Sequence, residues 1–574
     1  MASTSTTEQT PLLGNGSNAA VIDEENANLQ PANRKFRQGG VVALLIFITI
    51  MLLIFIFLPH NRPEETHEDI VSPRQITKNI FEHLNQFYLI AQNHNESYSS
   101  SSTKQASTTT KLATFDFDEE NFAIDPDNPA PSRSVTTGYN ASAQYIISLL
   151  TNRTRCDIQL QYFKVPIWEK FREAELNVTY LYDDVVEDNG KGMNSERKKQ
   201  DAKQAITYQG GVDFWSMRYG GQAANLTNKK IAVIPSHGCS DKGWEDVKDK
   251  IALIQEGGQC ELWISAYTAE LKGASAVIFY NSASRTKLLF NRVRIVDWKE
   301  GDPIMKIPVL AASFSLGQLL AFSKDKRIDL RTYTKISIVD TYNVICSLKD
   351  GGRKENTLVF GAHLDSVPAG PGLVDNASGS STLLEILLSL EKTNFTPKNH
   401  LVFAWWGAEE IGLLGSRHFV QEAVMSGENE NIALNLNFDM LGSPNYVPFI
   451  HRGEDAPEDV RNASIVIQNT FENFFKSIRE PYELIDMVAG SDFLPFIEHG
   501  IPSGGVLTGA GGLKSEEQRH TFKGFAHAPY DPCYHRSCDT LENVSEDAIS
   551  LMSQAAFHVI KKFATDKQIR QSLG

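Results

Sequence analysis

Two adjacent carboxylates, Glu409 and Glu410, follow an apolar run in the segment AWWGAEEIGLLGS (residues 404–416). Neighbouring carboxylates repel each other, and a buried carboxylate stays ionised only where a cation or hydrogen-bond donors compensate for the lost water. A divalent cation would make such a pair useful. One carboxylate could bind the cation, while the other stays off it and carries a proton during a reaction.

Residues of metal-ligand type also end other apolar runs. His363 and Asp365 come at the end of TLVFGAHLD, Asp439 comes near the end of IALNLNFDM, and Asp375 lies in the loop GPGLVDNASGSS. Each residue alone has an ordinary explanation, because lone histidines in strands are mostly structural and acidic residues commonly begin helices. Several of them at the ends of apolar strands instead predict one shared site.

The types of these side chains indicate the metal. Oxygen and imidazole ligands without thiolate suit zinc or a related divalent ion in a catalytic site. In a site for two ions, Asp375 is the natural bridging carboxylate, and Asp365 can accept the second N–H of the His363 imidazole. A second imidazole is still needed, and His535 in DPCYHRSCDT (residues 531–540) can supply it.

The pattern of the C-terminal half predicts the elements that carry these residues. Residues 357–365, 400–407 and 432–440 have the composition of buried strands, and residues 380–392 and 413–426 carry apolar side chains at helical spacing. Alternating strands and helices predict an α/β fold with a mostly parallel (mixed), doubly wound sheet. Ligands of such sheets gather beyond the carboxyl ends of the strands, where the candidate ligands lie.

Length and charge set limits on the whole chain. The 574 residues predict two or three domains, and the formal charge of −15 argues against nucleic acid as a partner, which would need a basic face. Residues 41–58, VVALLIFITIMLLIFIFL, contain no charge and no proline, and a helix of this length crosses ~30 Å of hydrocarbon. A cleaved signal peptide is the competing interpretation, but it would start nearer the N-terminus. We expect one transmembrane signal-anchor helix over residues 39–59.

The charges around this span predict its orientation. Arg34, Lys35 and Arg37 precede it and acidic residues follow it, so the positive-inside rule places the N-terminus in the cytoplasm and the rest outside it or in a lumen. All six cysteines follow the span, in a compartment that permits disulfides. Sequons for N-glycosylation, which suit a secretory route, lie at Asn95, Asn140, Asn152, Asn177, Asn225, Asn462 and Asn543.

The segment before the span carries a short sorting motif. In EQTPLLG, Glu8 followed by Leu12 and Leu13 resembles the acidic dileucine signal that adaptor complexes read in lysosomal and vacuolar membrane proteins. A chance match in a disordered tail is the alternative. We expect a single-pass type II protein of the vacuolar or lysosomal membrane, with its folded part in the lumen; the cell surface is the alternative location.

Taken together, the motifs resemble those of the co-catalytic zinc aminopeptidase family that includes aminopeptidase Y. AHLDS, GPGLVDNASG, GAEEIGLLGS, FDMLGSPN and CYHRSCDT occur in that family's order, over the chain from about residue 132 to its end. The resemblance implies two Zn²⁺ ions per chain. One would be held by His363, Asp439 and the bridging Asp375. The other would be held by Glu410, His535 and the same Asp375.

The same resemblance assigns catalytic roles. Glu409 would be the general base, and Tyr534 would donate a hydrogen bond to the developing oxyanion. Two cations lower the pKa of a bound water toward neutrality, so that Glu409 can take its proton and pass it to the leaving amine. The negative rim of the site would hold the free α-ammonium group of a peptide, which implies removal of N-terminal residues. The family also has a cis peptide after the bridging aspartate, here Asp375–Asn376.

A second resemblance concerns an inserted unit. Its segments KKIAVIPSHGCS, DVKDKIALIQEGGQC and ELKGASAVIFYNSAS resemble the β-rich protease-associated domain, and by this likeness Cys239 and Cys260 are disulfide partners. The low-complexity run ESYSSSSTKQASTTTK precedes the globular part and reads as a flexible stalk. The predicted domains are a cytoplasmic tail (1–38), the signal-anchor (39–59), a lumenal stalk (60–130), the zinc peptidase domain (131–184 and 336–574) and the protease-associated domain (185–335).

The sequence around the other four cysteines predicts their disulfide partners. Cys533 and Cys538 flank His535; a zinc ribbon would explain such a pair, but the remaining cysteines lack partner spacing, so a local disulfide is favoured. Cys156 and Cys346 lie in candidate strands on either side of the inserted unit. We expect these two to pair.

Two alternatives remain for the function. A membrane anchor with a protease-associated domain also resembles glutamate carboxypeptidase and the transferrin receptor. The carboxypeptidase is disfavoured because FDMLGSPN and CYHRSC resemble the aminopeptidases and little chain follows His535 for a helical dimerisation domain. A catalytically dead, receptor-like binding protein would have lost metal ligands, whereas this chain keeps all five and the general base.

Overall fold

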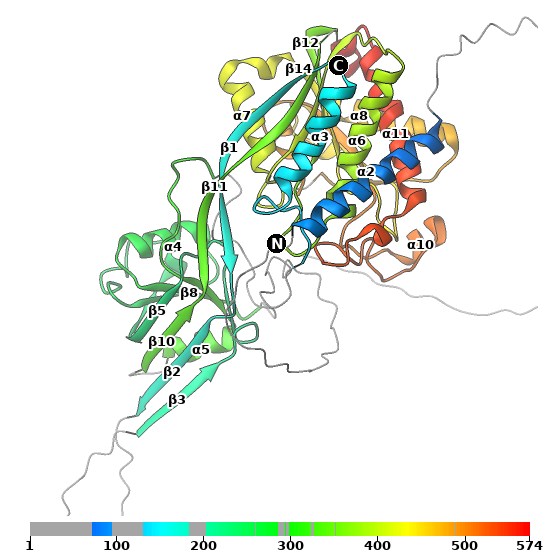
Figure 1. Ribbon diagram of the computed structural model, residues 1–574. Helices are drawn as coiled ribbons and strands as arrows, with labels where there is room; N and C mark the ends of the chain where they lie inside the picture. Colours follow the sequence, from blue (N-terminus) through cyan, green and yellow to red (C-terminus); the bar gives the residue numbers. More distant parts are fainter. Residues whose placement is uncertain are drawn as a thin grey trace, which may run out of the picture. The chain divides into compact units, whose positions relative to one another are not determined.

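The computed structural model describes residues 72–94, 130–182, 202–258, 260–284, 293, 298–322, 326–349, 352–487 and 490–574 (Figure 1). The predicted cytoplasmic tail and signal-anchor lie outside these residues. Within the described ranges, no helix is both long enough and apolar enough to cross a membrane.

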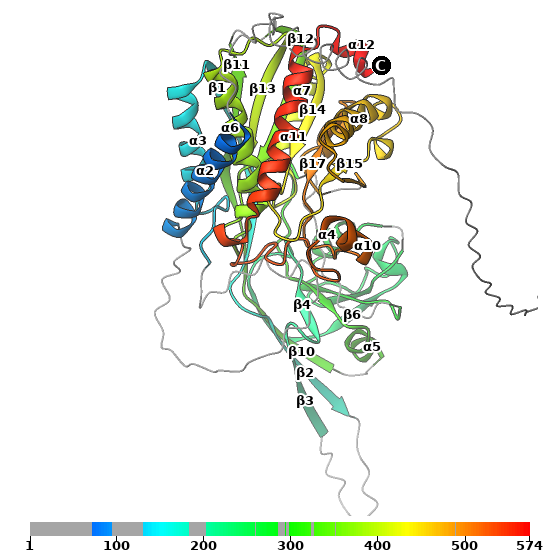
Figure 2. The ribbon, with the colours of Figure 1, turned by 90° about the vertical axis from the view of Figure 1, so that its right-hand side faces the viewer.

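The largest sheet contains the strands predicted for the peptidase domain. Its eight strands lie in the order β1-β11-β13-β12-β14-β17-β15-β16. Figures 1 and 2 label the strands of this sheet from β1 to β15. Their bounds are β1 (Cys156–Lys170), β11 (Thr334–Leu348), β12 (Arg353–His363), β13 (Asn399–Trp406), β14 (Ile432–Phe438), β15 (Phe449–His451), β16 (Glu483–Ile485) and β17 (Ser503–Leu507). The pairs β13–β12, β12–β14, β14–β17 and β15–β16 are parallel, whereas β1–β11, β11–β13 and β15–β17 are antiparallel. The predicted α/β fold with a mixed sheet is confirmed.

Helices cover both faces of this sheet, as the doubly wound pattern predicts. Leu358 and Phe360 of β12 belong to the main core, together with residues of α6 and α11, whereas Val359 belongs to a smaller core with residues of α7 and α9. Successive residues of a strand point to opposite faces, so a strand that is covered on both sides is apolar throughout. The helices of this domain are α2 (Pro73–Asn93), α3 (Tyr139–Arg153), α6 (Ser378–Lys392), α7 (Leu414–Ser426), α8 (Arg461–Ile478), α9 (Leu494–Ile497), α10 (Glu516–Phe522), α11 (Glu546–Thr565) and α12 (Ile569–Leu573).

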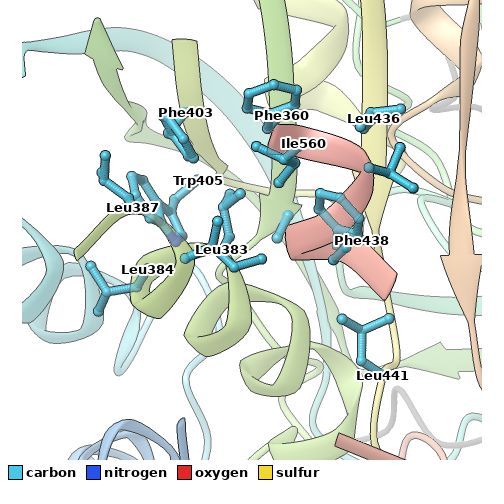
Figure 3. Close-up of a cluster of buried hydrophobic side chains, with 14 of the residues drawn as sticks. Phe360, Leu383, Leu384, Leu387, Phe403, Trp405, Leu436, Phe438, Leu441 and Ile560 are labelled. Carbon is cyan, nitrogen blue, oxygen red and sulfur yellow. The ribbon is translucent and has the colours of Figure 1, made fainter. Parts of the chain in front are cut away.

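The main core lies close to the strands that carry the candidate ligands. Figure 3 shows Phe403 and Trp405 of β13 beside Leu383 and Leu387 of α6, with Ile560 of α11 near the neighbouring strands. All five side chains are fully buried. Burying a large apolar side chain contributes ~2 kcal/mol, so this core gives the ends of the central strands a rigid support.

Helix α2 corrects the prediction of a stalk over residues 60–130. Ile80, Leu84 and Phe87 of this helix are fully buried in the main core, against α6 and α11. The Asn79 side chain also donates a hydrogen bond to Glu385 Oε1 of α6 over 2.8 Å. The apolar face at helical spacing belongs to the folded domain, although polar low-complexity sequence follows it. Residues 95–129 of the predicted stalk lie outside the described part of the chain.

The inserted unit contains two smaller sheets, with strand orders β3-β2-β10-β5 and β4-β9-β8-β7-β6. Their elements are β2 (Glu175–Tyr182), β3 (Ala202–Tyr208), β4 (Phe214–Ser216), β5 (Ala224–Lys229), β6 (Ile231–Ile234), β7 (Ile251–Gln255), α4 (Leu262–Leu271), β8 (Ala276–Tyr280), β9 (Val309–Ala312), α5 (Phe314–Phe322) and β10 (Lys326–Thr332). Because β2 pairs with β3 and β10, the unit begins at about residue 175 and not at the predicted residue 185.

The three predicted disulfides are all present. One joins the paired strands β1 and β11, the second lies within the inserted unit, and the third closes the loop that carries His535. They are Cys156–Cys346, Cys239–Cys260 and Cys533–Cys538.

Candidate metal centre

The topology of the sheet brings the candidate ligands to one edge. β12 lies between β13 and β14 and is parallel to both, so the carboxyl ends of the three strands are neighbours. His363 is the last residue of β12, Asp439 directly follows β14, and the Glu409–Glu410 pair comes shortly after β13. Asp375 lies in the turn Leu373–Ala377 that leads into α6, and its peptide bond to Asn376 is cis, as the resemblance implied.

His363 forms the centre of a first group of ligands. Its Nε2 atom lies 3.1 Å from Asp375 Oδ1, 3.3 Å from Asp439 Oδ1 and 4.0 Å from Glu409 Oε2. The imidazole is fully buried, so its position is set by the core around it.

His535 forms the centre of a second group. Its Nε2 atom lies 3.0 Å from Asp375 Oδ2 and 3.1 Å from Glu410 Oε2. The two oxygens of Asp375 therefore face two different imidazoles. This is the arrangement expected of a carboxylate that bridges two cations, and the structure brings all five predicted ligands together.

The donor set fits divalent cations. Ligand atoms of His363, Asp375 and Glu410 all lie within 4.8 Å of one another, as do those of His363, Glu409 and Asp439. Among the described residues, the buried oxygens Glu410 Oε1 and Asp439 Oδ1 accept no hydrogen bond. Oxygen and neutral imidazole are the ligands that zinc takes in catalytic sites, and a cation would neutralise this concentration of carboxylates.

Electrostatics in the site support the same fit. Burial alone would lower the pKa of His535, but Glu410 and Asp375 raise it to about 10. Burial alone would raise the pKa of Asp375, but hydrogen bonds from the two imidazoles hold it well below its ordinary value. Protons on the imidazoles thus balance the carboxylates. Because zinc binds neutral imidazole, cations would replace these protons.

Glu409 has the environment of a proton carrier. Burial raises its pKa well above the ordinary value; His363 opposes this shift, and neighbouring carboxylates add to it. Its carboxylate lies farther from the His363 ring than those of Asp375 and Asp439. A general base needs a raised pKa and a position beside the reacting groups.

Asp365 supports the site differently from the prediction. The His363 Nδ1 atom lies 3.1 Å from the backbone oxygen of Asp365 and 3.7 Å from its carboxylate, so the carbonyl, not the carboxylate, is its hydrogen-bond acceptor. The Asp365 carboxylate instead accepts the backbone N–H groups of Glu409, over 3.1 Å, and Glu410, over 3.3 Å. Asp365 therefore positions both glutamates. A periodic pattern cannot reveal this role, because the contact joins the segments that follow two different strands, β12 and β13.

Tyr534 adjoins the site at the position next to His535. The two rings are stacked with centroids 3.7 Å apart. Burial raises the pKa of Tyr534 well above its ordinary value, and the surrounding carboxylates raise it further. Its hydroxyl therefore keeps its proton and can donate a hydrogen bond.

Further residues form hydrogen bonds with the candidate ligands and position them. Ser491 Oγ donates to Asp439 Oδ2 over 2.6 Å, and Asn437 Nδ2 donates to Ser491 Oγ over 2.7 Å. Asp539 accepts the backbone N–H of Asp375 over 3.1 Å. Asn437 is a polar residue in an apolar strand, and Asp539 belongs to the His535 motif, so both carried a signal in the sequence. Ser491 carried none.

Arg133 braces the loop between His363 and Asp375. This fully buried side chain donates to the backbone oxygens of Leu364, Pro371, over 2.8 Å, and Gly372, over 2.6 Å. Burial lowers the pKa of Arg133 to about 10, against the effect of nearby aspartates, so it remains charged at neutral pH. No spacing or motif singles out this residue, which lies far from the loop in sequence.

The predicted glycosylation sites differ in accessibility. Asn177 is half-buried, and Asn95 lies outside the described residues. Asn543 is a special case, because its Nδ2 atom donates to Asp531 Oδ1 over 2.8 Å and to Asp539 Oδ1 over 3.2 Å. A glycan on that nitrogen would replace one of these hydrogens, which argues against modification there. The exposed sequon asparagines are Asn140, Asn152, Asn225 and Asn462.

Comparisons with known proteins identify the families of the two folded domains. The model of Peptidase family M28 matches residues 343–560, and that of the PA domain matches residues 223–320. An Aspergillus fumigatus protein named probable leucine aminopeptidase 2 is 33% identical over 374 residues, which are 63% of this chain and 72% of the relative. The chain belongs to peptidase family M28. An inserted PA domain, the protease-associated domain of the sequence resemblance, accompanies the M28 domain.

The chain covers slightly less of a second relative. A Pseudomonas aeruginosa protein (strain UCBPP-PA14) named aminopeptidase is 35% identical over 364 residues, and the match spans 66% of its length and 61% of this chain. Solved structures show the same fold. The aminopeptidase from Aneurinibacillus sp. strain AM-1 has a TM-score of 0.56 at 18% identity, covering 86% of this chain and 96% of that chain. The zinc aminopeptidase BSAP from Bacillus subtilis has a TM-score of 0.51 at 21% identity, with the same shares covered.

Proposed function

We propose that this chain is a zinc-dependent aminopeptidase that removes N-terminal residues from peptides with two Zn²⁺ ions. The main support is Asp375, whose two oxygens lie 3.1 and 3.0 Å from the Nε2 atoms of His363 and His535. His363, Asp439 and Asp375 would hold one ion, and Glu410, His535 and Asp375 the other. The aminopeptidase names of the M28 relatives support the same reaction.

The residues of the site would divide the work of peptide hydrolysis. Zinc bound here would supply a water of lowered pKa and would polarise the scissile carbonyl. Glu409 takes a proton from the attacking water and passes it to the leaving nitrogen. Tyr534 donates a hydrogen bond to the oxygen on which negative charge develops. The excess of carboxylates attracts a free α-ammonium group, which gives selectivity for the first residue of a peptide.

The proposed reaction can be tested with one substrate pair. The purified chain, loaded with zinc, is assayed on an aminoacyl-nitroanilide and on its N-acetylated form. We expect hydrolysis of the free substrate only, and loss of activity after chelation. Glu409→Gln should lower kcat by about 10²–10⁴-fold while the zinc content stays at two per chain, because Glu409 moves protons and does not bind the metal.

The control is Glu458→Gln, an exposed glutamate outside the site, which should leave kcat and KM unchanged. Equal hydrolysis of the acetylated substrate would exclude an aminopeptidase. Loss of zinc from the Glu409→Gln chain would make Glu409 a ligand instead of the base, since it lies near His363 and Asp439. A zinc-loaded chain inactive on both substrates would support the receptor-like alternative, and release of a C-terminal residue the carboxypeptidase.

We also propose a type II orientation in the vacuolar or lysosomal membrane, with the M28 domain in the lumen. The uncharged segment 41–58, the basic residues before it and the EQTPLLG motif support this location. Protease added to intact organelles should remove an N-terminal tag and leave the M28 domain protected. Replacing Leu12 and Leu13 by alanine should move the protein to the cell surface if adaptor complexes read the motif. An unchanged distribution would reject that role.

A further inference from the structure

Asp539 binds three successive amides of the turn that carries the bridging aspartate. Its backbone oxygen accepts the N–H of Leu373 over 3.2 Å. Its Oδ1 accepts the N–H of Val374 over 2.9 Å, and its Oδ2 accepts the N–H of Asp375 over 3.1 Å. One buried residue therefore fixes the backbone from which Asp375 projects.

The same residue ends the loop that carries the second imidazole. The N–H of Asp539 donates to the backbone oxygen of Arg536 over 3.0 Å, and the Cys533–Cys538 disulfide closes the loop just before it. Asp375 and His535 meet at 3.0 Å. Both are thus attached to Asp539, Asp375 through its turn and His535 through its loop.

Asn543 ties this arrangement to the start of the loop. Its Nδ2 group donates to Asp539 Oδ1 over 3.2 Å and to Asp531 Oδ1 over 2.8 Å. Asp531 Oδ1 also accepts the N–H of Cys533 over 2.8 Å. The two ends of the His535 loop are therefore held by one amide group, and Asp531 and Asp539 are each 1% exposed.

The geometry of this contact favours a carboxylate: burial raises the pKa of Asp539 well above its ordinary value, and the hydrogen bonds from the Val374 and Asp375 amides oppose that shift. Two N–H groups donate to two different oxygens of Asp539, and both oxygens of a carboxylate are acceptors. Asparagine offers one acceptor oxygen and would point its NH₂ group at the other N–H. A buried amide without an acceptor is costly, so the turn would shift. A hydrophobic side chain would leave both amides without partners.

We propose that Asp539 is a positioning residue that keeps the bridging Asp375 at the correct distance from His535. The cation proposed to bind Glu410, His535 and Asp375 is retained for this reason. This inference rests on the proposed dinuclear zinc site. Groups that orient metal ligands commonly change metal affinity by about 10–100-fold when they are removed. The cation held by Glu410, His535 and Asp375 should be affected first, because Asp539 acts on two of those three ligands.

The test compares zinc retention in the full chain. Wild type, Asp539→Asn and Asp213→Asn are dialysed against increasing concentrations of a chelator, and zinc per chain, kcat, KM and thermal unfolding are measured. Asp213 is the matched control, because it also accepts a backbone N–H, that of Gln209 over 2.8 Å, but lies in the inserted domain. We expect Asp539→Asn to lose one of its two ions at a chelator concentration about 10–100-fold lower than wild type. Its kcat should fall with little change in KM, and added zinc should restore kcat.

A second variant keeps the proposal testable if Asp539→Asn does not fold. Asn543→Ala leaves both turn amides bound to Asp539 and removes only the side-chain amide that links Asp539 to Asp531, so a several-fold earlier loss of the second ion is expected. This change also removes a sequon. Ser545→Asp removes the sequon but keeps Asn543 and a capping side chain for α11, and it should match wild type.

The outcomes separate this inference from the proposed function. A wild-type chain that never holds two zinc ions would overturn the dinuclear site itself, and the role of Asp539 with it. If wild type holds two, and Asp539→Asn and Asn543→Ala resist the chelator as wild type does, Asp539 is merely structural and the inference is wrong. If the Asp539→Asn chain has a lower unfolding temperature but keeps both zinc ions as wild type does, the inference is likewise wrong.

Discussion

Asp375 shows how single residues define this site. Its two oxygens face two imidazoles, while Asp365 positions Glu409 and Glu410 through their backbone amides. A carboxylate in this site can thus be a candidate metal ligand, or it can accept hydrogen bonds that position the candidate ligands. Which role each one takes depends on where its backbone lies, and not on its chemistry.

The buried Arg133 leads to a stability prediction at the residue scale. Arg133→Met would leave the backbone oxygens of Leu364 and Pro371 without a donor, whereas the Gly372 oxygen keeps the N–H of Ala377. Each unsatisfied buried oxygen costs on the order of 1–3 kcal/mol. The variant no longer has to bury a guanidinium charge, and this gain offsets part of the cost. We expect the free energy of unfolding to fall by about 3 kcal/mol, measured by urea denaturation.

The control for Arg133 is Arg331→Met, in which the replaced side chain is mostly exposed and pairs with Glu175. A surface pair of this kind contributes less than about 1 kcal/mol. Equal losses for the two variants would mean that Arg133 does not brace the loop.

Helix α2 carries the main lesson at the scale of elements. It docks on α6 and α11 through one apolar face, although the chain beyond it is polar and low in complexity. A helix of this kind is stabilised by its packing more than by its own propensity. The M28 domain therefore begins well before the residues that the family model matches.

Leu84→Ala tests this docking. Leu84 is fully buried, and a leucine-to-alanine change in a core costs about 2–5 kcal/mol because of lost contacts and a residual cavity. Leu89 lies on the same helix and is 42% exposed, so Leu89→Ala should cost less than about 1 kcal/mol. Urea denaturation of both variants provides the comparison. Similar small losses would show that α2 is not part of the core.

The whole molecule contains separate cores. The M28 domain and the inserted domain each have their own cluster of buried side chains, and the paired strands β1 and β11 lead from one to the other. Domains with separate cores need not unfold together. Stability measurements should therefore follow the unfolding transition of the M28 domain. The pH dependence of the free energy of unfolding of this domain then reflects its own buried groups.

His451 predicts how the stability of the M28 domain depends on pH. Burial lowers its pKa to about 4, and its ring packs against Phe493 with centroids 4.7 Å apart. Because the folded pKa lies below the unfolded value of about 6.5, the stabilising effect is complete above pH 6.5 and is lost as the pH falls toward 4. The shift corresponds to about 3 kcal/mol.

His451→Phe should therefore flatten the decline in stability between pH 6.5 and pH 4, measured as the urea midpoint at several pH values. His520→Phe, at an exposed histidine of α10, is the matched control and should leave the decline as in wild type. A wild-type decline that persists in the His451→Phe chain would reject this origin. The effect bears on an acidic lumen, where the folded part is proposed to reside.

The sequence alone determined the local elements and most of the ligands. The apolar pattern of 357–365, 400–407 and 432–440 predicts three buried strands, and parallel strands must bring His363, Asp439 and the glutamate pair to one edge. These inferences succeed because periodicity and the handedness of strand–helix–strand connections act over short stretches of chain.

Only the tertiary structure decided which distant groups meet. It placed α2 in the core, gave β2 to the inserted domain and turned the Asp365 carboxylate toward two amides and away from His363. The amide of Val374 finds Asp539 at a separation of 165 residues. No local pattern encodes such a pairing, because its free energy comes from contacts that exist only once the sheet and its loops have assembled.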